Sequence, residues 1–276
     1  MRRPGPTVRT RVVEHLGDGT ERRHEDRLVG EEPLEIRLAW PGAAARRVWV
    51  TMRTPGHDFE LAAGWVRHEG LVGDRPGDVA GVGYCTDVSL SEEERYNVVT
   101  VTLAAPPLRD PGHRHEAASA GSSACGVCGS DSLADALAVS SGARWDGPLP
   151  TPEVVRGLPD AMRATQQVFD RTGGAHAAAL ATADGEVVVV REDVGRHNAV
   201  DKVTGARMLA GLPSAEACLV VSGRAGFELV QKAVAAGIGS LVAVGAPTSL
   251  SVRLATEHGL ALYAFTRPGR VVSYSR

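Results

Sequence analysis

The sequence lacks any apolar run long enough to cross a membrane. Its longest runs, residues 217–221 and 241–244, have the length of strands, whereas a membrane helix needs about 20 residues. Arg2-Arg3 precedes no apolar stretch, so the twin arginine does not predict export. We therefore expect a cytoplasmic protein whose few cysteines stay reduced: Cys85, Cys125, Cys128 and Cys218.

Aromatic residues are scarce, with four each of Trp, Tyr and Phe among 276 residues, which argues against a base-stacking surface. The 30 basic and 33 acidic residues leave a formal charge of -3, which disfavours a sequence-independent grip on nucleic acid. Lysine is rarer still, since only Lys202 and Lys232 occur in a chain rich in arginine. The composition, 43% hydrophobic and 23% charged, excludes a disordered chain and a coiled coil. Together with the length, it predicts one large or two modest domains.

Four segments follow one another along the chain. Residues 1–30 are charged and predict an irregular N-terminal arm without a function. Residues 31–115 predict a small α+β domain, with strands near 34–38, 48–52, 79–88 and 97–103 and a helix that runs from an Asp58 N-cap to Gly70. Residues 116–130 predict a mobile loop that carries a C-x-x-C pair, and residues 131–276 predict an α/β domain.

The α/β domain shows a regular alternation. A helix over 154–168 precedes a hairpin whose strands, 175–182 and 186–192, flank the turn Asp184-Gly185. Helices and strands then alternate over 198–265, which predicts a mixed sheet with helices on both faces. Ligands of such sheets gather beyond the carboxyl ends of the strands. The corresponding loops here are 193–198, 222–226, 246–249 and 266–270.

The pair Cys125 and Cys128 precedes a predicted helix whose first turn favours the thiolate form of a nearby cysteine. A four-cysteine zinc site is disfavoured because the other two cysteines are isolated in sequence. A site that adds His113 and His115 stays open, although H-x-H departs from the usual zinc-finger spacing. A thioredoxin-like pair, which normally follows a hydrophobic strand, is a minor alternative because residues 116–124 are Ala, Ser and Gly-rich.

Deaminase chemistry is absent, since no histidine has a glutamate two positions later. Two inert, buried cysteines also fit poorly with the surrounding glycines. We therefore favour a mobile loop that carries a reactive thiol.

Five segments together resemble the FdhD family, the sulfurtransferases that activate formate dehydrogenase. The match follows chain order from about residue 30 onwards, and its most specific block is Arg191-Glu192-Asp193-Val194-Gly195-Arg196-His197-Asn198-Ala199-Val200-Asp201-Lys202. The other matching segments are 54–64, 123–129, 172–178 and 222–228. The resemblance implies a cytidine-deaminase-like fold for the C-terminal domain.

The same resemblance implies a sulfur carrier with a cysteine persulfide intermediate. Sulfur would pass from a cysteine desulfurase to the molybdenum cofactor before the cofactor enters formate dehydrogenase. The cofactor, a bis-molybdopterin guanine dinucleotide, would bind as the acceptor substrate, and guanine nucleotides would mimic it. Cys125 matches the persulfide carrier and Cys128 matches the second cysteine. The family's cofactor-binding stretch falls on Phe265, Thr266, Arg267, Pro268, Gly269 and Arg270. The resemblance also implies a homodimer. We expect no metal, and the composition and the short apolar runs already disfavour nucleic acid and membrane partners.

The acceptor is a polyanion, so cations and helix N-termini should surround it. Candidates are Arg196, His197 and Lys202 near a helix capped by Asn198, Arg224 in a Gly-flanked loop, and Arg267 with Arg270 at the C-terminal end.

Plain structural roles compete with several of these assignments. His197 could equally be a structural hydrogen-bond donor, and Lys202 could form an ion pair on the surface. Asp193 is expected to order its loop. His176 is expected in the core, Asp58 and Glu60 at a helix cap or a domain contact, and Cys85 and Cys218 buried and inert. Two other functions remain: a cofactor-binding chaperone whose cysteines are incidental, and a redox or zinc protein.

Overall fold

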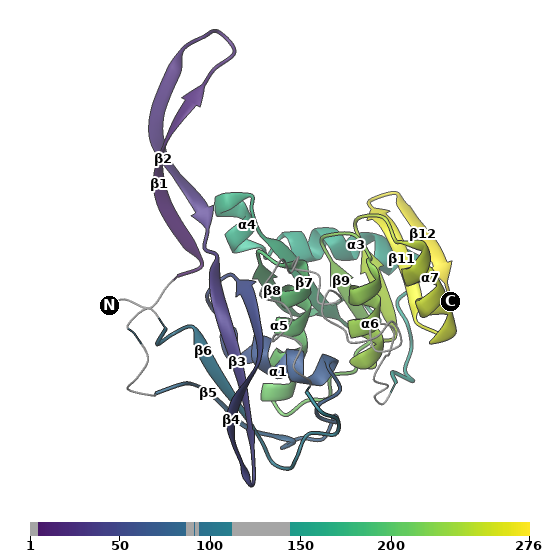
Figure 1. The fold of residues 1–276 in the computed structure, drawn as a ribbon. Helices are drawn as coiled ribbons and strands as arrows, with labels where there is room; N and C mark the ends of the chain where they lie inside the picture. The colour runs from purple at the N-terminus through teal and green to yellow at the C-terminus, as the bar shows by residue number, and fades with distance from the viewer. Residues whose placement is uncertain (1–4, 87–90, 92–93, 112–143) are drawn as a thin grey trace.

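A computed structural model describes residues 5–86, 91, 94–111 and 144–276, arranged as three sheets with helices (Figure 1). The cysteine pair at 125 and 128, the loop 116–130, and His113 and His115 lie outside the described residues, so the domain boundaries drawn there stay predictions. Within the described ranges, no helix combines the length and apolarity that a membrane crossing requires.

The N-terminal arm is a β-hairpin and not the irregular segment that its charge pattern predicted. Strands β1 (Thr7–His15) and β2 (Glu21–Val29) pair antiparallel and extend away from the rest of the molecule (Figure 1). Gly19 adopts a φ of 83° at the turn, and the Asp18 carboxylate accepts a hydrogen bond from the Thr20 N–H at 2.9 Å. The prediction was wrong because charged residues occupy positions that usually carry the apolar alternation of a strand.

The small domain contains a four-stranded sheet of order β4-β3-β6-β5. Helix α1 (Asp58–His68) covers one face, where Leu61 and Trp65 pack against Leu34, Ile36 and Leu38. The predicted strands are confirmed as β3 (Glu32–Trp40), β4 (Ala43–Arg53), β5 (Val79–Tyr84) and β6 (Val98–Leu103).

The large sheet has six strands in the order β12-β11-β10-β9-β7-β8. Strands β9, β10 and β11 are parallel, whereas β7 is antiparallel to both of its neighbours and β12 is antiparallel to β11, so the predicted mixed sheet is confirmed. Its strands are β7 (His176–Ala181), β8 (Val187–Asp193), β9 (Cys218–Val221), β10 (Ser240–Ala243), β11 (Ala261–Arg267) and β12 (Arg270–Ser275).

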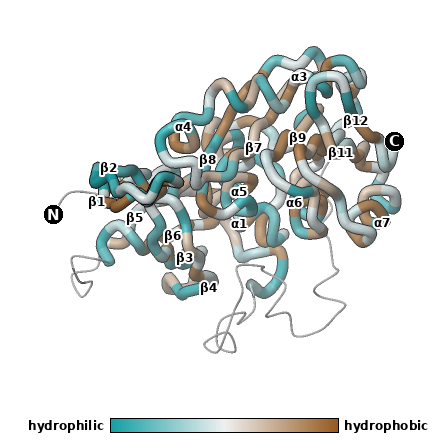
Figure 2. Tube along the Cα trace, turned by 90° about the horizontal axis from the view of Figure 1, so that it is seen from above, coloured by the Kyte–Doolittle hydropathy of each residue, from teal (hydrophilic) through white to brown (hydrophobic). Residues whose placement is uncertain are grey.

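Helices cover both faces of this sheet, as predicted, with one apolar core on each side (Figure 2). The expected helix over 154–168 is instead two helices, because the Glu192 carboxylate accepts hydrogen bonds from the Val168 and Phe169 N–H groups at 2.8 Å and so caps the second one. The helices are α3 (Pro152–Arg163) on one face, and α5 (Arg196–Leu209), α6 (Phe227–Ala235) and α7 (Ser249–Glu257) on the other. The short helix α4 (Gln167–Thr172) follows α3 and contacts β2 of the arm.

Helix α1 joins the two larger sheets, because it packs on the small sheet and also against α5. The two helices meet at Gly64 and Gly205. A Cβ atom on Gly64 would overlap the Asp201 carbonyl oxygen, and one on Gly205 would overlap the Glu60 carbonyl oxygen. Glycine at both positions therefore allows the backbones to touch.

Candidate functional site

The carboxyl ends of β8, β9, β10 and β11 and the start of β7 share one edge of the large sheet. A cavity of about 450 Å³ opens at this edge. Its walls come from two of the predicted loops, through Ser222, Thr266, Arg267 and Pro268, and from His176. The edge therefore has the volume of a small-molecule site.

The other wall of the cavity comes from α3, α4 and the Gly173-Gly174 turn, which the sequence did not assign to a site. Met162, Gln166 and Phe169 contribute here. The available signal was the turn itself, since two glycines directly before a strand allow the chain to approach a ligand closely.

The predicted cofactor-binding stretch, residues 265–270, lies in the turn of the β11–β12 hairpin and not at the end of the last strand. Phe265 has a φ of 51°, and its N–H donates to the Gly245 carbonyl at 3.2 Å. The Arg270 guanidinium lies 5.5 Å from the Phe265 ring centre. Thr266 is 1% exposed, and its Oγ1 has no hydrogen-bond partner within the described residues. An unpaired hydroxyl on a cavity wall is suited to a ligand contact.

His176 is half-buried on the cavity wall and is not the core histidine that the sequence predicted. Its Nδ1 lies 3.4 Å from the Ser222 hydroxyl. Burial lowers the pKa of His176, and the nearby positive charges of Arg196 and His197 lower it further. The imidazole is therefore neutral at pH 7 and can either donate or accept a proton at this edge.

The cationic candidates divide into two groups. Arg196, Arg224 and Arg267 lie on the loops at this edge, and none forms an ion pair with a carboxylate of the described residues. In contrast, His197 Nε2 lies 2.6 Å from Glu228 Oε2 between α5 and α6, which favours its structural role. The arginines are therefore available to an anion.

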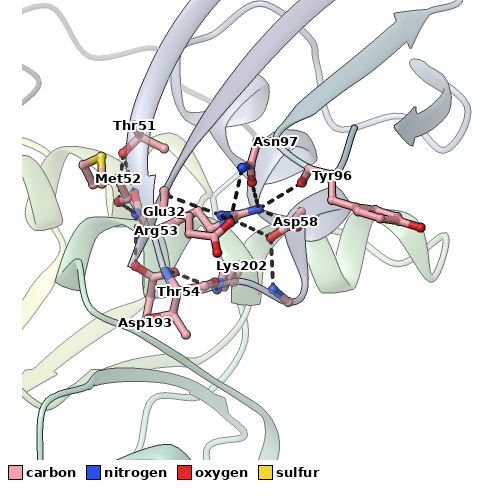
Figure 3. Close-up of polar contacts among 12 residues, drawn as sticks. Glu32, Thr51, Met52, Arg53, Thr54, Asp58, Tyr96, Asn97, Asp193 and Lys202 are labelled. Carbon is pink, nitrogen blue, oxygen red and sulfur yellow. Dashed lines mark hydrogen bonds and ion pairs between the residues drawn. The ribbon is translucent and has the colours of Figure 1, made fainter. Parts of the chain in front are cut away.

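Lys202 and Asp193 form a buried ion pair of 2.7 Å between the two larger sheets, where Lys202 is 1% exposed and Asp193 is fully buried (Figure 3). The Lys202 ammonium also donates to the Thr54 carbonyl at 2.9 Å. It is therefore not in a surface pair, and it has no exposed atoms to offer to the predicted anion. The Asp193 carboxylate accepts from the N–H groups of Thr54 and Gly195, so the prediction that it orders its loop is confirmed.

Asn198 does not cap α5, because Gly195 occupies the N-cap position. Its side-chain amide instead donates to the Met52 carbonyl at 2.8 Å and to Asp193 at 3.1 Å. Asn198 therefore ties the β8–α5 loop to β4.

Asp58 likewise does not cap α1, whose N-cap is His57 in a left-handed conformation. The Asp58 carboxylate accepts two hydrogen bonds from the buried Arg53 guanidinium, at 3.0 and 3.1 Å (Figure 3), and one from the Tyr84 hydroxyl. This cluster fixes the start of α1 to β4 and β5.

Glu60 makes the domain contact that the sequence offered as its second alternative. Its carboxylate binds the Arg191 guanidinium of β8 through two contacts of 2.5 and 2.7 Å, and His57 Nδ1 lies 3.0 Å away. Burial alone would raise the pKa of Glu60, but these two partners lower it to about 2. Glu60 is therefore an anion throughout the physiological range.

A second buried cluster lies between α1, α5 and α6. Asp201 Oδ1 contacts His68 Nδ1 at 2.5 Å and Lys232 Nζ at 2.6 Å, and the other His68 nitrogen lies 3.1 Å from the Thr204 hydroxyl. Burial lowers the pKa of His68 to about 4, although the bond to Asp201 opposes the shift. Neutral His68 therefore belongs to the folded interface.

The two described cysteines differ in exposure. Cys218 is fully buried, so the prediction that it is buried is confirmed, and burial raises the pKa of its thiol to about 12. Cys85 follows β5 directly and is half-buried, with the Arg37 guanidinium 3.7 Å from its sulfur. It is less buried than the sequence predicted.

Comparison with known proteins places this geometry in a family. The model of the FdhD/NarQ family matches residues 29–276. Proteins named sulfur carrier protein FdhD from Streptomyces coelicolor and from Mycolicibacterium paratuberculosis are each 49% identical, covering 98% of this chain and 95% and 97% of theirs. A crystal structure from Desulfotalea psychrophila, named as a formate dehydrogenase accessory protein, shows the same fold with a TM-score of 0.72. It is 21% identical in sequence, and the match covers 98% of this chain and 97% of that one. The chain therefore belongs to the FdhD/NarQ family.

Proposed function

We propose that this protein is a sulfurtransferase that carries sulfur on Cys125 and delivers it to the molybdenum cofactor of formate dehydrogenase. Family membership supports the general role, since its relatives are named as sulfur carriers and its structural neighbour as a formate dehydrogenase accessory protein. The observation on this chain that carries the proposal is the cavity at the sheet edge, whose wall holds Arg267 and the unpaired Thr266 hydroxyl, with Arg196 and Arg224 on neighbouring loops of the same edge.

The first step is a thiol exchange at Cys125. Its thiolate attacks the terminal sulfur of a persulfide on a cysteine desulfurase, the donor S–S bond breaks, and the donor leaves as a thiolate. Attack of the Cys128 thiolate on Cys125 Sγ would then release the carried sulfur as sulfide and leave a disulfide between the two cysteines. This second step supplies the two electrons that the carried sulfur needs to become sulfide.

The acceptor substrate, a bis-molybdopterin guanine dinucleotide, carries two pyrophosphate groups. Arg196, Arg224 and Arg267 provide guanidinium groups suited to phosphate oxygens. Thr266 Oγ1 and neutral His176 offer polar contacts to a purine or pterin edge. Lys202 has no place in this proposal, because its ammonium is buried elsewhere.

Three further features belong to the same proposal. The α/β domain would share the cytidine-deaminase fold without its chemistry, the protein would work as a homodimer, and it would act in the cytoplasm. The mixed sheet with helices on both faces is compatible with the first of these.

Intact-mass spectrometry tests the carrier step. The protein is incubated with a cysteine desulfurase and cysteine, beside Cys125→Ala and Cys128→Ala variants. We expect a reductant-sensitive gain of one sulfur that only Cys125→Ala abolishes. If neither the unmodified chain nor Cys128→Ala, which cannot discharge its sulfur, gains sulfur from a donor that loads another acceptor, the persulfide step is wrong, and a cofactor-binding chaperone becomes the better interpretation.

A further inference from the structure

The arm built from β1 and β2 is a two-stranded ribbon that leaves the body of the molecule (Figure 1). Isolated two-stranded ribbons are marginally stable in water. Among the described strands, β2 pairs only with β1, and α4 contacts β2 where the ribbon joins the body, so the part of the outer edge beyond α4 presents unpaired backbone groups. Such an edge is a template for another strand.

The charges along β2 are arranged symmetrically about His24. Residues 21–27 read Glu-Arg-Arg-His-Glu-Asp-Arg, so each charged residue lies at the same distance from His24 as a residue of opposite charge. We propose that β2 pairs antiparallel with β2 of a second copy, around a two-fold axis at His24. This inference rests on the homodimer proposed above and names its interface.

The pairing matches every charge along the edge. Glu21 lies opposite the partner's Arg27, Arg22 opposite the partner's Asp26, and Arg23 opposite the partner's Glu25. Opposite charges at directly facing positions stabilise strand pairs, whereas like charges destabilise them.

The charges also select the register. A shift by one residue places Glu21 opposite the partner's Asp26 or Arg22 opposite the partner's Arg27, and a shift by two places Arg23 opposite the partner's Arg23 or Arg27. Each alternative therefore contains at least one repulsive pair. Complementary charges at an interface mainly specify register and partner in this way.

Two arginines of β2 have no acidic residue directly opposite them on β1. Arg27 faces Arg9 across the ribbon, and Arg23 faces Val13. Neither forms an ion pair within the described residues, whereas Arg22 pairs with Glu14 at 2.7 Å. A second copy would provide Glu21 and Glu25 to these two arginines, in addition to the contacts that Glu21 makes with His15 at 3.3 Å and Glu25 with Arg9 at 3.7 Å within the hairpin.

The proposed geometry brings each arm close to the other copy's candidate site. Residues 24–29 span about 17 Å at about 3.4 Å per residue. Within one chain, α4 contacts β2, and Gly174 lies against Val29. The turn of one arm would therefore lie beside the partner's α4, the helix that contributes to the cavity wall.

Charge reversal at Arg27 tests the pairing without damage to the hairpin. In Arg27→Glu, the new carboxylate faces Arg9 favourably within the chain, but it faces Glu21 of the partner subunit across the interface. Glu21→Arg creates the matching Arg-Arg repulsion. Arg109→Glu, at an exposed loop position outside the arm, has the same change in charge as Arg27→Glu and serves as its control.

Sedimentation equilibrium of the full-length chain measures the outcome. We expect a dimer whose dissociation constant rises at least tenfold in Arg27→Glu and in Glu21→Arg, and stays unchanged in Arg109→Glu. An equimolar mixture of Arg27→Glu and Glu21→Arg should recover the original affinity as a heterodimer, and so should the double variant as a homodimer.

The proposal is overturned if the unmodified chain stays monomeric, if either single variant dimerises as tightly as the unmodified chain, or if the mixture fails to associate. A dimer that ignores all these changes refutes the arm pairing but leaves the homodimer standing. Sulfur loading of Cys125 is read by mass in the same preparations, so failure of the carrier role is detected separately.

Discussion

Replacement of Lys202 by Met should destabilise the fold by about 3 kcal/mol, the lower end of the range of about 3–5 kcal/mol for breaking a buried ion pair. The change leaves Asp193 fully buried without its cation at 2.7 Å. The lower end applies because the carboxylate keeps hydrogen bonds from Thr54, Gly195 and Asn198. Urea unfolding, followed by circular dichroism, measures the loss.

A matched variant separates the loss of the pair from the loss of the lysine stem. Asp193→Asn removes the buried negative charge, so the combination of Asp193→Asn with Lys202→Met should be more stable than Lys202→Met alone. If the double variant is instead less stable, by the sum of the two single losses, the residues are not coupled and the reasoning is refuted. Guanine nucleotide binding should survive in Lys202→Met, because the ammonium does not reach the cavity.

Three further outcomes are expected. Gly64→Ala should separate α1 from α5, because its methyl group would meet the Asp201 carbonyl, and thermal unfolding should show a loss of at least about 1–3 kcal/mol; an unchanged midpoint would contradict this contact. The pKa of His68 is lowered to about 4 in the folded chain, so the unfolded chain binds this proton first as pH falls. The free energy of unfolding should therefore fall between pH 6.5 and 4 by on the order of 3 kcal/mol more than in His68→Gln. Equal pH slopes of the two proteins in urea titrations would exclude this linkage. Arg267→Ala should weaken guanosine diphosphate binding about tenfold by calorimetry, relative to Arg109→Ala, because one charge-assisted hydrogen bond to phosphate is lost.

Local patterns predicted most of the fold. The alternation in 34–38 and 48–52 predicted β3 and β4, and the turn Asp184-Gly185 between apolar runs predicted the β7–β8 hairpin. These signals succeed because a strand's own residues record which face is buried. The arm was missed for the same reason, because a ribbon with few buried residues carries little apolar alternation.

The candidate site was only partly predictable, because its contacts join distant parts of the chain. The loops beyond β9 and β11 follow from the order of elements, and Ser222 and Arg267 do line the cavity. In contrast, Lys202 looked like a helix-end cation, and only the fold shows that the Thr54 carbonyl, 148 residues away, accepts a hydrogen bond from its ammonium. Spacing along a chain does not reveal such a partner.

The contact between Gly64 and Gly205 also determines how the chain can be divided. Because α1 contributes to the core of the small domain and also covers α5, a fragment cut between the two domains would expose Asp201, Lys202 and the apolar residues around them to water. Neither half has an independent surface at this boundary. The two domains should therefore fold as one cooperative unit. A chimera that takes one domain from a relative should also take the helix, α1 or α5, that packs against it.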